Sequence, residues 1–425
     1  MENELRRLDA LSRRGFIEGL AKSCLGVSAL PFLSSGAFAA QSTGKAKHVI
    51  YLFMQGAMSH LDTFDPKTHP DTKGETKAIS TSVSGIKIAD TLPNLAKIMN
   101  QLAVIRGMTT ETGAHEQGQY LMRTSYKQIA STRHPFLGSW LHKMDGKLNP
   151  DLPGSVTIGG ANRHPRAGFM KAVYSPAPVG NAKNGLENTK PPGYLSESQF
   201  DKRQRLINKF ERGFRARYQH DEVQSYIDFY REATKLMKSQ DLKAFDINEE
   251  SKETRTAYGE NGIGQGCLLA RRLVEKRVRF IEVDFGSWDN HRDIFTTIPD
   301  KAGQLDKALS TLLKDLKSKG LLNETLVVVG TEFGRTPKIN QNAGRDHHPG
   351  AFSCVLAGAG IKGGQVWGAS DEKGQSVEDG HTSPADLNAT IATALGLPID
   401  KEIFSPAGRP FKVAHDGTPI KELLS

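Results

Sequence analysis

The chain has 425 residues, of which 37% are hydrophobic and 24% charged, and its formal net charge is +9. A chain of this length and composition can bury a large core, which excludes a disordered protein and a small disulfide-stapled domain. The three cysteines form no Cys-x-x-Cys zinc signature; we expect Cys267 and Cys354, which lie beyond the amino-terminal segment, to be buried thiols, with one disulfide between them as the alternative. The positive charge favours an anionic partner or substrate, although a merely basic surface explains it as well.

The amino terminus carries the features of an export signal. Arg13 and Arg14 lie in the run SRRGFI, an apolar segment rich in Gly, Ala and Leu follows, and the run AFA (37–39) fits a small-x-small cleavage pattern. The paired arginines are typical of twin-arginine signals. We therefore expect residues 1–39 to be removed, the mature chain to be periplasmic or extracellular, and the twin-arginine machinery to be a partner. No other segment is long and apolar enough for a membrane span.

The rest of the chain alternates between apolar runs and helical patterns. Apolar runs predict strands at 47–54, 102–105, 154–158, 278–284, 325–330 and 352–357. Apolar residues at three- and four-residue spacings predict helices at 119–126, 136–144, 262–276, 299–319 and 384–395, the last with Ser383 as its N-cap. This alternation predicts an α/β fold, with a mainly parallel sheet sandwiched by helices in one domain from 40 to 425.

One long segment, at about 145–258, interrupts this rhythm and is expected to be an insertion. Its first part, to about residue 200, is rich in Gly, Pro and Asn, and we expect an irregular excursion around the strand at 154–158. Its second part is charged and helical in its spacing, which predicts a helical cap. Acidic residues interleave with the basic ones there, so we expect a solvated helix face and no nucleic-acid partner.

Residue types that bind metals follow three of the predicted strands. Asp289 and His291 follow the strand that ends at 284, Glu332 follows the strand that ends at 330, and Asp62 lies in the loop after the first strand. Because ligands bind beyond the carboxyl ends of strands in open α/β sheets, we expect these loops to meet at one site. A carboxylate with a neutral imidazole suits Zn, Mn or Fe better than Ca or Mg. The alternative is a structural turn in which Asp289 caps backbone amides.

The run GRDHHPG adds Asp346, His347 and His348 just before the strand that begins at 352. If that strand runs antiparallel to its neighbours, its start lies at the same edge as the other loops, and one or two of these side chains can reach a metal. Nearby, Arg335 offers a guanidinium fork that matches phosphate or sulfate. An ion pair between Glu332 and Arg335 is the alternative.

Three more residues carry groups that could react. Thr112 and His115 follow the strand at 102–105 and therefore lie at a carboxyl strand end as well. Ser59, in the first loop, has the side chain of a nucleophile, but the sequence places no base beside it.

Five runs of the chain carry a family resemblance in combination: SRRGFI, KHVIYLFMQGAMSHLDTFDPK, DFGSWDNH, GTEFGRTP and GRDHHPG. With them, the chain resembles the exported family called domain of unknown function 1501 (DUF1501). The resemblance covers nearly the whole chain. That family resembles the alkaline phosphatase superfamily, which includes sulfatases and phosphomutases. The resemblance implies an alkaline phosphatase-like α/β sandwich with a one- or two-metal site that cleaves or transfers phosphate or sulfate esters.

The chain departs from the superfamily pattern at two positions. Gln55 stands where the first strand normally ends in an acidic ligand, so Asp62 or Asp65 would have to substitute. Phe333 follows Glu332 where the superfamily has a histidine after its acid. The remaining ligands of the pattern are matched by Asp289, His291, and His347 or His348. The usual place of the nucleophile falls near Thr112 and His115. We therefore expect a single metal ion.

The first functional hypothesis is an exported, metal-dependent hydrolase of a phosphate or sulfate ester. One divalent ion, Zn, Mn or similar, would be held by Asp289, His291, Glu332 and His347, with Asp346, His348 and Asp62 as further candidates. The catalytic candidates are Arg335, His115 and Thr112. The alternative is a catalytically degenerate periplasmic binding protein of the same fold, for an anionic polysaccharide or another anion. A third hypothesis is a peptidase or carbohydrate esterase that uses Ser59.

Overall fold

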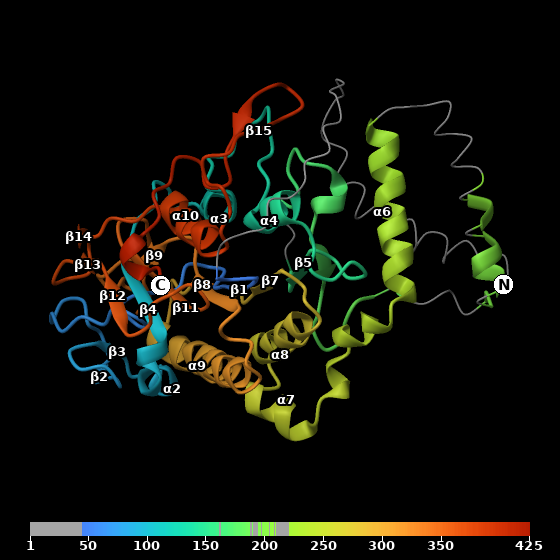
Figure 1. Ribbon diagram of the computed structural model, residues 1–425. Coiled ribbons are helices and arrows are strands. Elements are labelled where there is room, and N and C mark those ends of the chain that lie inside the picture. The colour runs from blue at the N-terminus through green and yellow to red at the C-terminus, as the bar shows by residue number, and fades with distance from the viewer. Residues whose placement is uncertain are drawn as a thin grey trace.

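The computed structural model describes residues 45–425 apart from 161–162, 188, 190–193, 197, 204, 208 and 210–220. An eight-stranded sheet lies at its centre (Figure 1). The strands run across it in the order β12 (Gln365–Trp367), β4 (Leu102–Met108), β11 (Phe352–Gly358), β8 (Thr325–Gly330), β1 (His48–Phe53), β7 (Phe280–Asp284), β5 (Ser155–Ile158) and β6 (Ala177–Val179). The predicted export signal, 1–39, lies outside the described residues.

Strand direction brings the site loops to one edge. β1 pairs in parallel with both β7 and β8, and Phe53 is in register with Asp284 on one side and Gly330 on the other. The carboxyl ends of these three strands therefore lie side by side. β11 is antiparallel to β4 and to β8, so its amino-terminal end lies at this same edge. Every residue of β1 and β8 is buried, as expected for strands covered on both faces.

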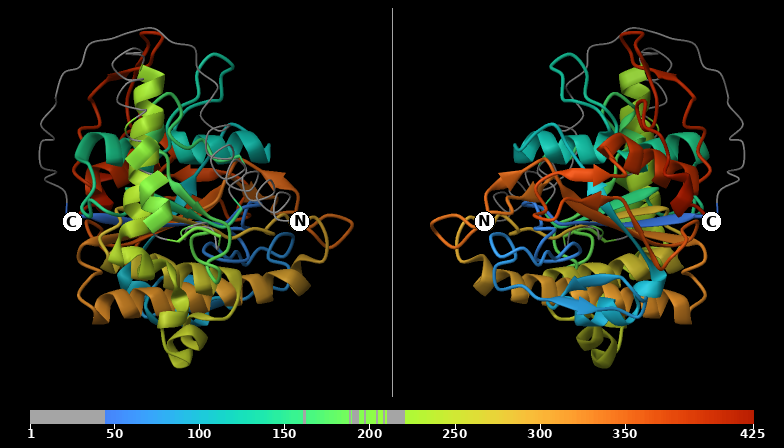
Figure 2. Two further views of the ribbon diagram at one scale, coloured as in Figure 1. Left: turned by 90° about the vertical axis from the view of Figure 1, so that its right-hand side faces the viewer. Right: turned by 90° about the vertical axis from the view of Figure 1, so that its left-hand side faces the viewer.

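Helices cover both faces of the sheet, as Figures 1 and 2 show. One layer contains α2 (Pro93–Lys97), α7 (Lys252–Tyr258), α8 (Gly262–Glu275) and α9 (Ile294–Ser318). The other contains α3 (His115–Thr124), α4 (Leu137–Asp145) and α10 (Pro384–Ala394). Each layer has its own apolar core: Leu268 and Leu305 lie in the first, Trp140 and Leu387 in the second. The predicted α/β sandwich is confirmed.

Several element boundaries differ from the prediction. α9 begins at Ile294 instead of 299, because Pro299 is accommodated inside the helix. α3 begins at His115 instead of 119, which places that histidine at the first helical position. The segment from 145 to 200 supplies two strands of the sheet, β5 and β6, where one was expected. The long helix of the expected cap, α6 (Asp221–Lys238), stands at the side of the fold beyond β5 in Figure 1.

Other expectations are met at the level of single residues. Ser383 caps α10, and its side chain accepts a hydrogen bond from the amide of Asp386 in a capping box. Cys267 and Cys354 are buried free thiols, and they lie in the cores on opposite faces of the sheet. Of the helices that the structure describes, none combines the length and the apolar character that a membrane crossing needs.

Candidate metal centre

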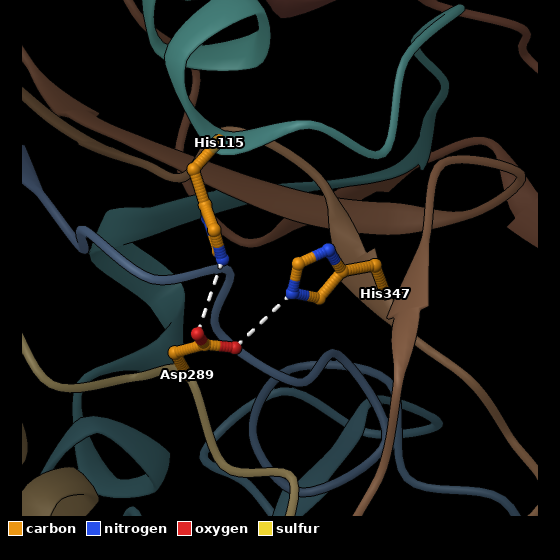
Figure 3. Close-up of side chains that lie close together, drawn as sticks. All are labelled: His115, Asp289 and His347. Atoms are coloured by element: carbon orange, nitrogen blue, oxygen red, sulfur yellow. Dashed lines mark hydrogen bonds and ion pairs between the residues drawn. The ribbon is translucent and has the colours of Figure 1, made fainter.

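Loops from distant parts of the chain meet beyond the carboxyl ends of the central strands. Asp289 comes from the loop after β7, His115 from the start of α3, and His347 from the short strand β10 (His347–His348) that precedes β11. Figure 3 shows the three side chains pointing toward one another. Their side chains are 44%, 28% and 28% exposed, so the cluster is open to solvent. A small molecule can therefore reach it.

Three ligand atoms form a closed triangle in this cluster. The Oδ1 atom of Asp289 lies 3.0 Å from His291 Nε2 and 3.2 Å from His347 Nε2. The two Nε2 atoms lie 3.1 Å apart. The ligand atoms of a tetrahedral zinc site, each about 2.0–2.1 Å from the ion, stand roughly 3.3 Å from one another. The triangle thus has nearly the dimensions of one face of such a site.

His115 approaches the same carboxylate from its other oxygen. Its Nε2 atom lies 3.3 Å from Asp289 Oδ2, and ligand atoms of His115, Asp289 and His347 all lie within 4.8 Å of one another. That Nε2 atom is buried and has no hydrogen-bond partner. A buried polar atom without a partner is costly, and a bound ion or substrate atom would satisfy it.

All three imidazoles are held through their Nδ1 atoms. The Nδ1 atom of His115 lies 2.8 Å from Glu332 Oε1, that of His291 lies 2.7 Å from Asp346 Oδ1, and that of His347 lies 2.7 Å from the carbonyl oxygen of Gly113. Each acceptor fixes the ring with Nδ1 protonated, which leaves Nε2 free to face the cluster. Histidines that bind metals are held in this way by a carboxylate or a backbone carbonyl. The donor set therefore fits a divalent metal ion.

The charges of the cluster favour an anionic carboxylate and oppose a neutral His115. Although burial opposes its ionisation, the hydrogen bond from Arg335 lowers the pKa of Asp289 to about 2. The hydrogen bond to Glu332 raises the pKa of His115 above its usual value, whereas burial lowers that of His347. A metal ion that used His115 would have to displace its proton, so the pH would affect its binding.

Arg335 has a different place from the one expected. It is fully buried, and Nη2 donates to Asp289 Oδ1 and to the carbonyl oxygen of Gly56. Nε donates to the carbonyl oxygen of Ala57 at 2.9 Å, and Nη1 to that of Arg345 at 3.2 Å. With these donors committed, the guanidinium holds Asp289 in place and is not presented to a substrate anion. The expected ion pair of Arg335 with Glu332 is replaced by two others, because Arg335 pairs with Asp289 and Glu332 pairs with His115.

Glu332 supports the cluster from behind. Its side chain is fully buried, and Oε1 accepts hydrogen bonds from the amide of Gly56 at 2.8 Å, from Gln119 Nε2 at 3.3 Å and from His115. Its predicted role as a direct ligand is replaced by that of an anchor for His115. Gly56 is required at this crossing: its φ is +111°, and a Cβ there would lie 2.6 Å from the amide nitrogen of Asp289.

Four of the predicted residues do not reach the cluster through their own ligand atoms. Asp62 is fully buried in an ion pair with Arg345 at 2.9 Å. His348 points away from His347, as neighbours in a strand do, and its Nε2 lies 2.6 Å from the carbonyl oxygen of Gln375. Thr112 caps a turn by accepting from the amide of Ala114. Asp346 acts through His291 alone.

Ser59 is not placed as a nucleophile. Its side chain is buried, and Oγ donates to Asp62 Oδ2 at 2.5 Å. The histidine of the same loop, His60, is buried too and contacts the carbonyl oxygen of Gly374 through Nε2. No observation therefore favours a serine esterase or peptidase at this loop.

One polar network beneath the cluster was missed in the sequence. Arg123 Nε donates to Glu282 Oε1 and Nη2 to Asp284 Oδ1, each at 2.7 Å. Burial raises the pKa of Asp284 to about 7, and one of its carboxylate oxygens is buried without a partner. The signal was available: Arg123 follows His115 by eight residues on α3, with Gln119 between them, so all three lie on one helix face.

The architecture and the cluster together define an α/β sandwich with a solvent-accessible histidine–carboxylate centre at the carboxyl ends of its strands. The family model described as "Protein of unknown function (DUF1501)" matches residues 46–424. The chain belongs to this family, which confirms the resemblance seen in its motifs. No curated protein matches the sequence.

Solved structures of similar shape were found at low sequence identity. The lipoteichoic acid synthase LtaP from Listeria monocytogenes is 11% identical, with 90% of this chain and 79% of that chain covered and a TM-score of 0.44. A protein in the alkaline phosphatase superfamily from Vibrio parahaemolyticus is 12% identical, with coverages of 97% and 79% and a TM-score of 0.39. The PsFucS1 sulfatase from Pseudoalteromonas sp. is 14% identical, with coverages of 88% and 73% and a TM-score of 0.37.

Proposed function

We propose that the protein is a metal-dependent hydrolase of a phosphate or sulfate ester. The observation that carries the proposal is the triangle of Asp289 Oδ1, His291 Nε2 and His347 Nε2, whose edges measure 3.0, 3.1 and 3.2 Å. Three protein ligands with an open further position are typical of catalytic zinc sites, whereas structural sites are closed. The half-exposed side chains of Asp289 and His291 fit the open type.

The residues of the cluster have different roles in this proposal. Asp289, His291 and His347 would hold one divalent ion, which supplies Lewis-acid polarisation of an ester oxygen. Arg335 fixes the Asp289 carboxylate, and Asp346 and the Gly113 carbonyl fix the two imidazoles. The first amides of α3, the helix that begins at His115, have no acceptor within the helix, and the amino-terminal end of a helix favours an anionic group.

The test is a metal and activity measurement on the protein purified from cells that export it with its own leader. We expect about one divalent ion per chain, and turnover of an aryl phosphate or an aryl sulfate that chelation abolishes and metal restores. The double variant Asp289→Asn/His291→Asn should lose both the ion and the turnover. A protein without metal whose stability is unchanged in that variant would refute the proposal.

A second candidate is a non-catalytic protein that binds an anion at the same cluster. It is favoured by Gln55 and Phe333, which replace the acidic ligand and the histidine ligand of the superfamily pattern. Gln55 donates to Gln119 at 3.4 Å, and the ring of Phe333 packs 5.0 Å from His115 and 4.9 Å from His347. Binding of an anionic polysaccharide that survives chelation, without turnover of either ester, would support this candidate over the hydrolase.

We further propose that the protein acts outside the cytoplasm, after export by the twin-arginine route. The run SRRGFI and the cleavage pattern at 37–39 support this proposal. Its substrate would be a small or polymeric anionic ester, in keeping with the net charge of +9. Mutation of Arg13 and Arg14 to lysine, followed by cell fractionation, should retain the precursor in the cytoplasm; normal export of that variant would exclude the route.

A further inference from the structure

We propose that His115 is the nucleophile of the reaction and that the substrate is a phosphate ester, whose phosphoryl group is carried for one step on Nε2. The inference rests on the proposed hydrolase function. It assigns to His115 a role other than that of a fourth metal ligand. Four observations of the described residues carry it.

The first observation is that three ligand atoms for a metal ion are present without His115. Asp289 Oδ1, His291 Nε2 and His347 Nε2 lie within 3.2 Å of one another. His115 faces the other oxygen, Oδ2, at 3.3 Å. It therefore borders the triangle on the side of the second oxygen.

The second is that His115 is held as a directed nucleophile. Its Nδ1–H donates to Glu332, a carboxylate that is itself completely buried. The opposite atom, Nε2, is buried, makes no hydrogen bond, and lies 3.3 Å from the Asp289 carboxylate. One carboxylate thus orients the ring through Nδ1, while Nε2 makes no hydrogen bond, which is the arrangement of a nucleophile held by an adjacent group.

The third is the position of His115 at the start of a ten-residue helix. It is the first residue of α3, and Ala114 before it makes no side-chain cap. The amides of His115, Glu116 and Gln117 thus have no acceptor inside the helix. They can donate to the oxygens of a phosphoryl group as it approaches Nε2, and the positive end of the helix favours that charge.

The fourth is that the rival nucleophiles singled out in the sequence are engaged elsewhere. Ser59 is buried against Asp62, and Thr112 Oγ1 lies 2.9 Å from Gln117 Oε1 and caps the amide of Ala114. The thiols of Cys267 and Cys354 are buried in the two cores. Ser287, two residues before Asp289, is exposed and is the natural comparison in the test.

The chemistry balances in two steps. In the first, Nε2 of His115 loses its proton to solvent and its lone pair attacks phosphorus; the N–P bond forms, and the P–O bond to the leaving alcohol or phenol breaks with its electron pair on oxygen, which takes a proton from solvent. In the second, the oxygen of a water molecule attacks phosphorus, the N–P bond breaks with its electron pair returning to Nε2, and the proton of the water passes to solvent. The products are the alcohol and inorganic phosphate.

The experiment uses the metal-loaded protein with 4-nitrophenyl phosphate as the probe. We expect a burst of nitrophenolate in the wild type and, after rapid quenching in base, a phosphoryl group on the peptide that contains His115, stable in base and lost in acid. His115→Ala should keep its metal, lose turnover by about 10³-fold, and regain roughly tenfold with added imidazole. Ser287→Ala should behave like the wild type.

Other results would overturn the assignment while the hydrolase function stands. If His115→Ala lost its ion, as we expect of Asp289→Asn/His291→Asn, His115 would be a metal ligand. If it stayed loaded and active within threefold of wild type, or if the trapped group were acid-stable and absent from Ser287→Ala, the nucleophile would be another group. A wild type that turned over neither an aryl phosphate nor an aryl sulfate would overturn the hydrolase function, and the assignment of His115 with it.

Discussion

At the scale of single residues, the orientation of the imidazoles distinguishes this cluster from a chance gathering of polar groups. Asp346 shows this most clearly, because its carboxylate is half exposed and contacts His291 Nδ1 at 2.7 Å and Asn340 Nδ2 at 3.0 Å. Those two hydrogen bonds lower the pKa of Asp346, with the contribution of His291 the larger. The residue can therefore be changed without opening the core.

We predict that Asp346→Asn lowers the affinity for a divalent ion by about 10–100-fold, the usual effect of losing a carboxylate behind a metal-binding histidine. The melting temperature of the metal-free protein should change little, because surface substitutions usually alter stability by less than about 0.5 kcal/mol. Isothermal titration with zinc measures the first quantity and thermal unfolding in chelator the second. Asp416→Asn, at an exposed acid that pairs with Lys412 and His415, is the control. Equal zinc affinities in the wild type, Asp346→Asn and Asp416→Asn would contradict the prediction.

At the scale of elements, the strands could be predicted well from the sequence and the contacts of the site only in part. Long apolar runs such as 325–330 identify strands that are buried on both faces, and the prediction of β8 is correct to the residue. The convergence of Asp289, His291 and His347 followed from the rule that loops meet at the carboxyl edge of a parallel sheet. The antiparallel direction of β11, on which His347 depended, is confirmed.

Side-chain direction could not be predicted in the same way. Which of two consecutive histidines faces the cluster depends on the pairing of β10 with β9 (Gly334–Arg335), and that pairing involves only four residues. The burial of Arg335 depends on carbonyl oxygens of Gly56, Ala57 and Arg345, which carry no signal in the sequence. The ion pair of Asp62 with Arg345 could not be predicted either, because the two residues lie 283 positions apart in the sequence. Asp62 was therefore expected to be a metal ligand.

The crossing of the loops after β1 and β7 gives a test at this scale. At Gly56, where φ is +111°, a Cβ would approach the Asp289 and Trp288 amide nitrogens to 2.6 and 2.8 Å. We predict that Gly56→Ala displaces Asp289, lowers zinc affinity at least tenfold, and destabilises the fold by roughly 1–3 kcal/mol through backbone strain. Zinc titration and urea unfolding measure the two effects.

The matched control lies in the facing loop. A Cβ added at Gly286 would have Gln55 Oε1 as its nearest neighbour, at 3.9 Å, which is ordinary contact, and the φ of Gly286 is not in the left-handed range. Gly286→Ala should therefore keep zinc affinity and stability near the wild-type values. If the two alanine variants behaved alike, the close approach at Gly56 would not be what positions Asp289.

At the scale of the whole molecule, buried neutral histidines link stability to pH. Burial lowers the pKa of His48, His60 and His142 to about 4; hydrogen bonds to backbone carbonyls oppose this for His48 and His60, whereas nearby cations add to it for His142. Between about pH 6.5 and pH 4 the unfolded chain binds protons at these residues and the folded chain does not. The free energy of unfolding should therefore fall as the pH is lowered through this window, by roughly 3 kcal/mol for a residue as buried as His60 once both states are below their pKa values.

Urea unfolding in chelator at several pH values between 7.5 and 4.5 measures this dependence without the contribution of metal binding. His60→Gln keeps a donor for the Gly374 carbonyl oxygen but cannot take up a proton, so its stability should vary less with pH than that of the wild type. His415→Gln, at a histidine whose side chain is 46% exposed, should follow the wild type. A wild type whose stability is constant from pH 6.5 to pH 4.5 would refute the linkage.

The two ends of the described chain lie at the sheet edge opposite the candidate metal centre. The amide of Ala46 donates to the carbonyl oxygen of Ala394 at 3.0 Å, that of Ser425 to the carbonyl oxygen of Gly360 at 3.0 Å, and Lys45 Nζ to Ser425 Oγ at 3.3 Å. β1 then begins at His48 and runs from this edge of the sheet to the opposite edge, where the loop that contacts Asp289 follows. The contacts of the centre described above are thus made by residues after Lys45.

We therefore predict that a chain beginning at Lys45 folds and binds zinc as tightly as the full-length protein, within about threefold. If residues 45–425 fold by themselves, they can also take up metal before the export that we propose. Zinc titration and thermal unfolding of the shortened and full-length proteins, both made in the cytoplasm, test this. If the shortened chain unfolded several degrees earlier or bound zinc at least tenfold more weakly, residues before Lys45 would be part of the folded domain, and the leader could not be treated as a separable export signal.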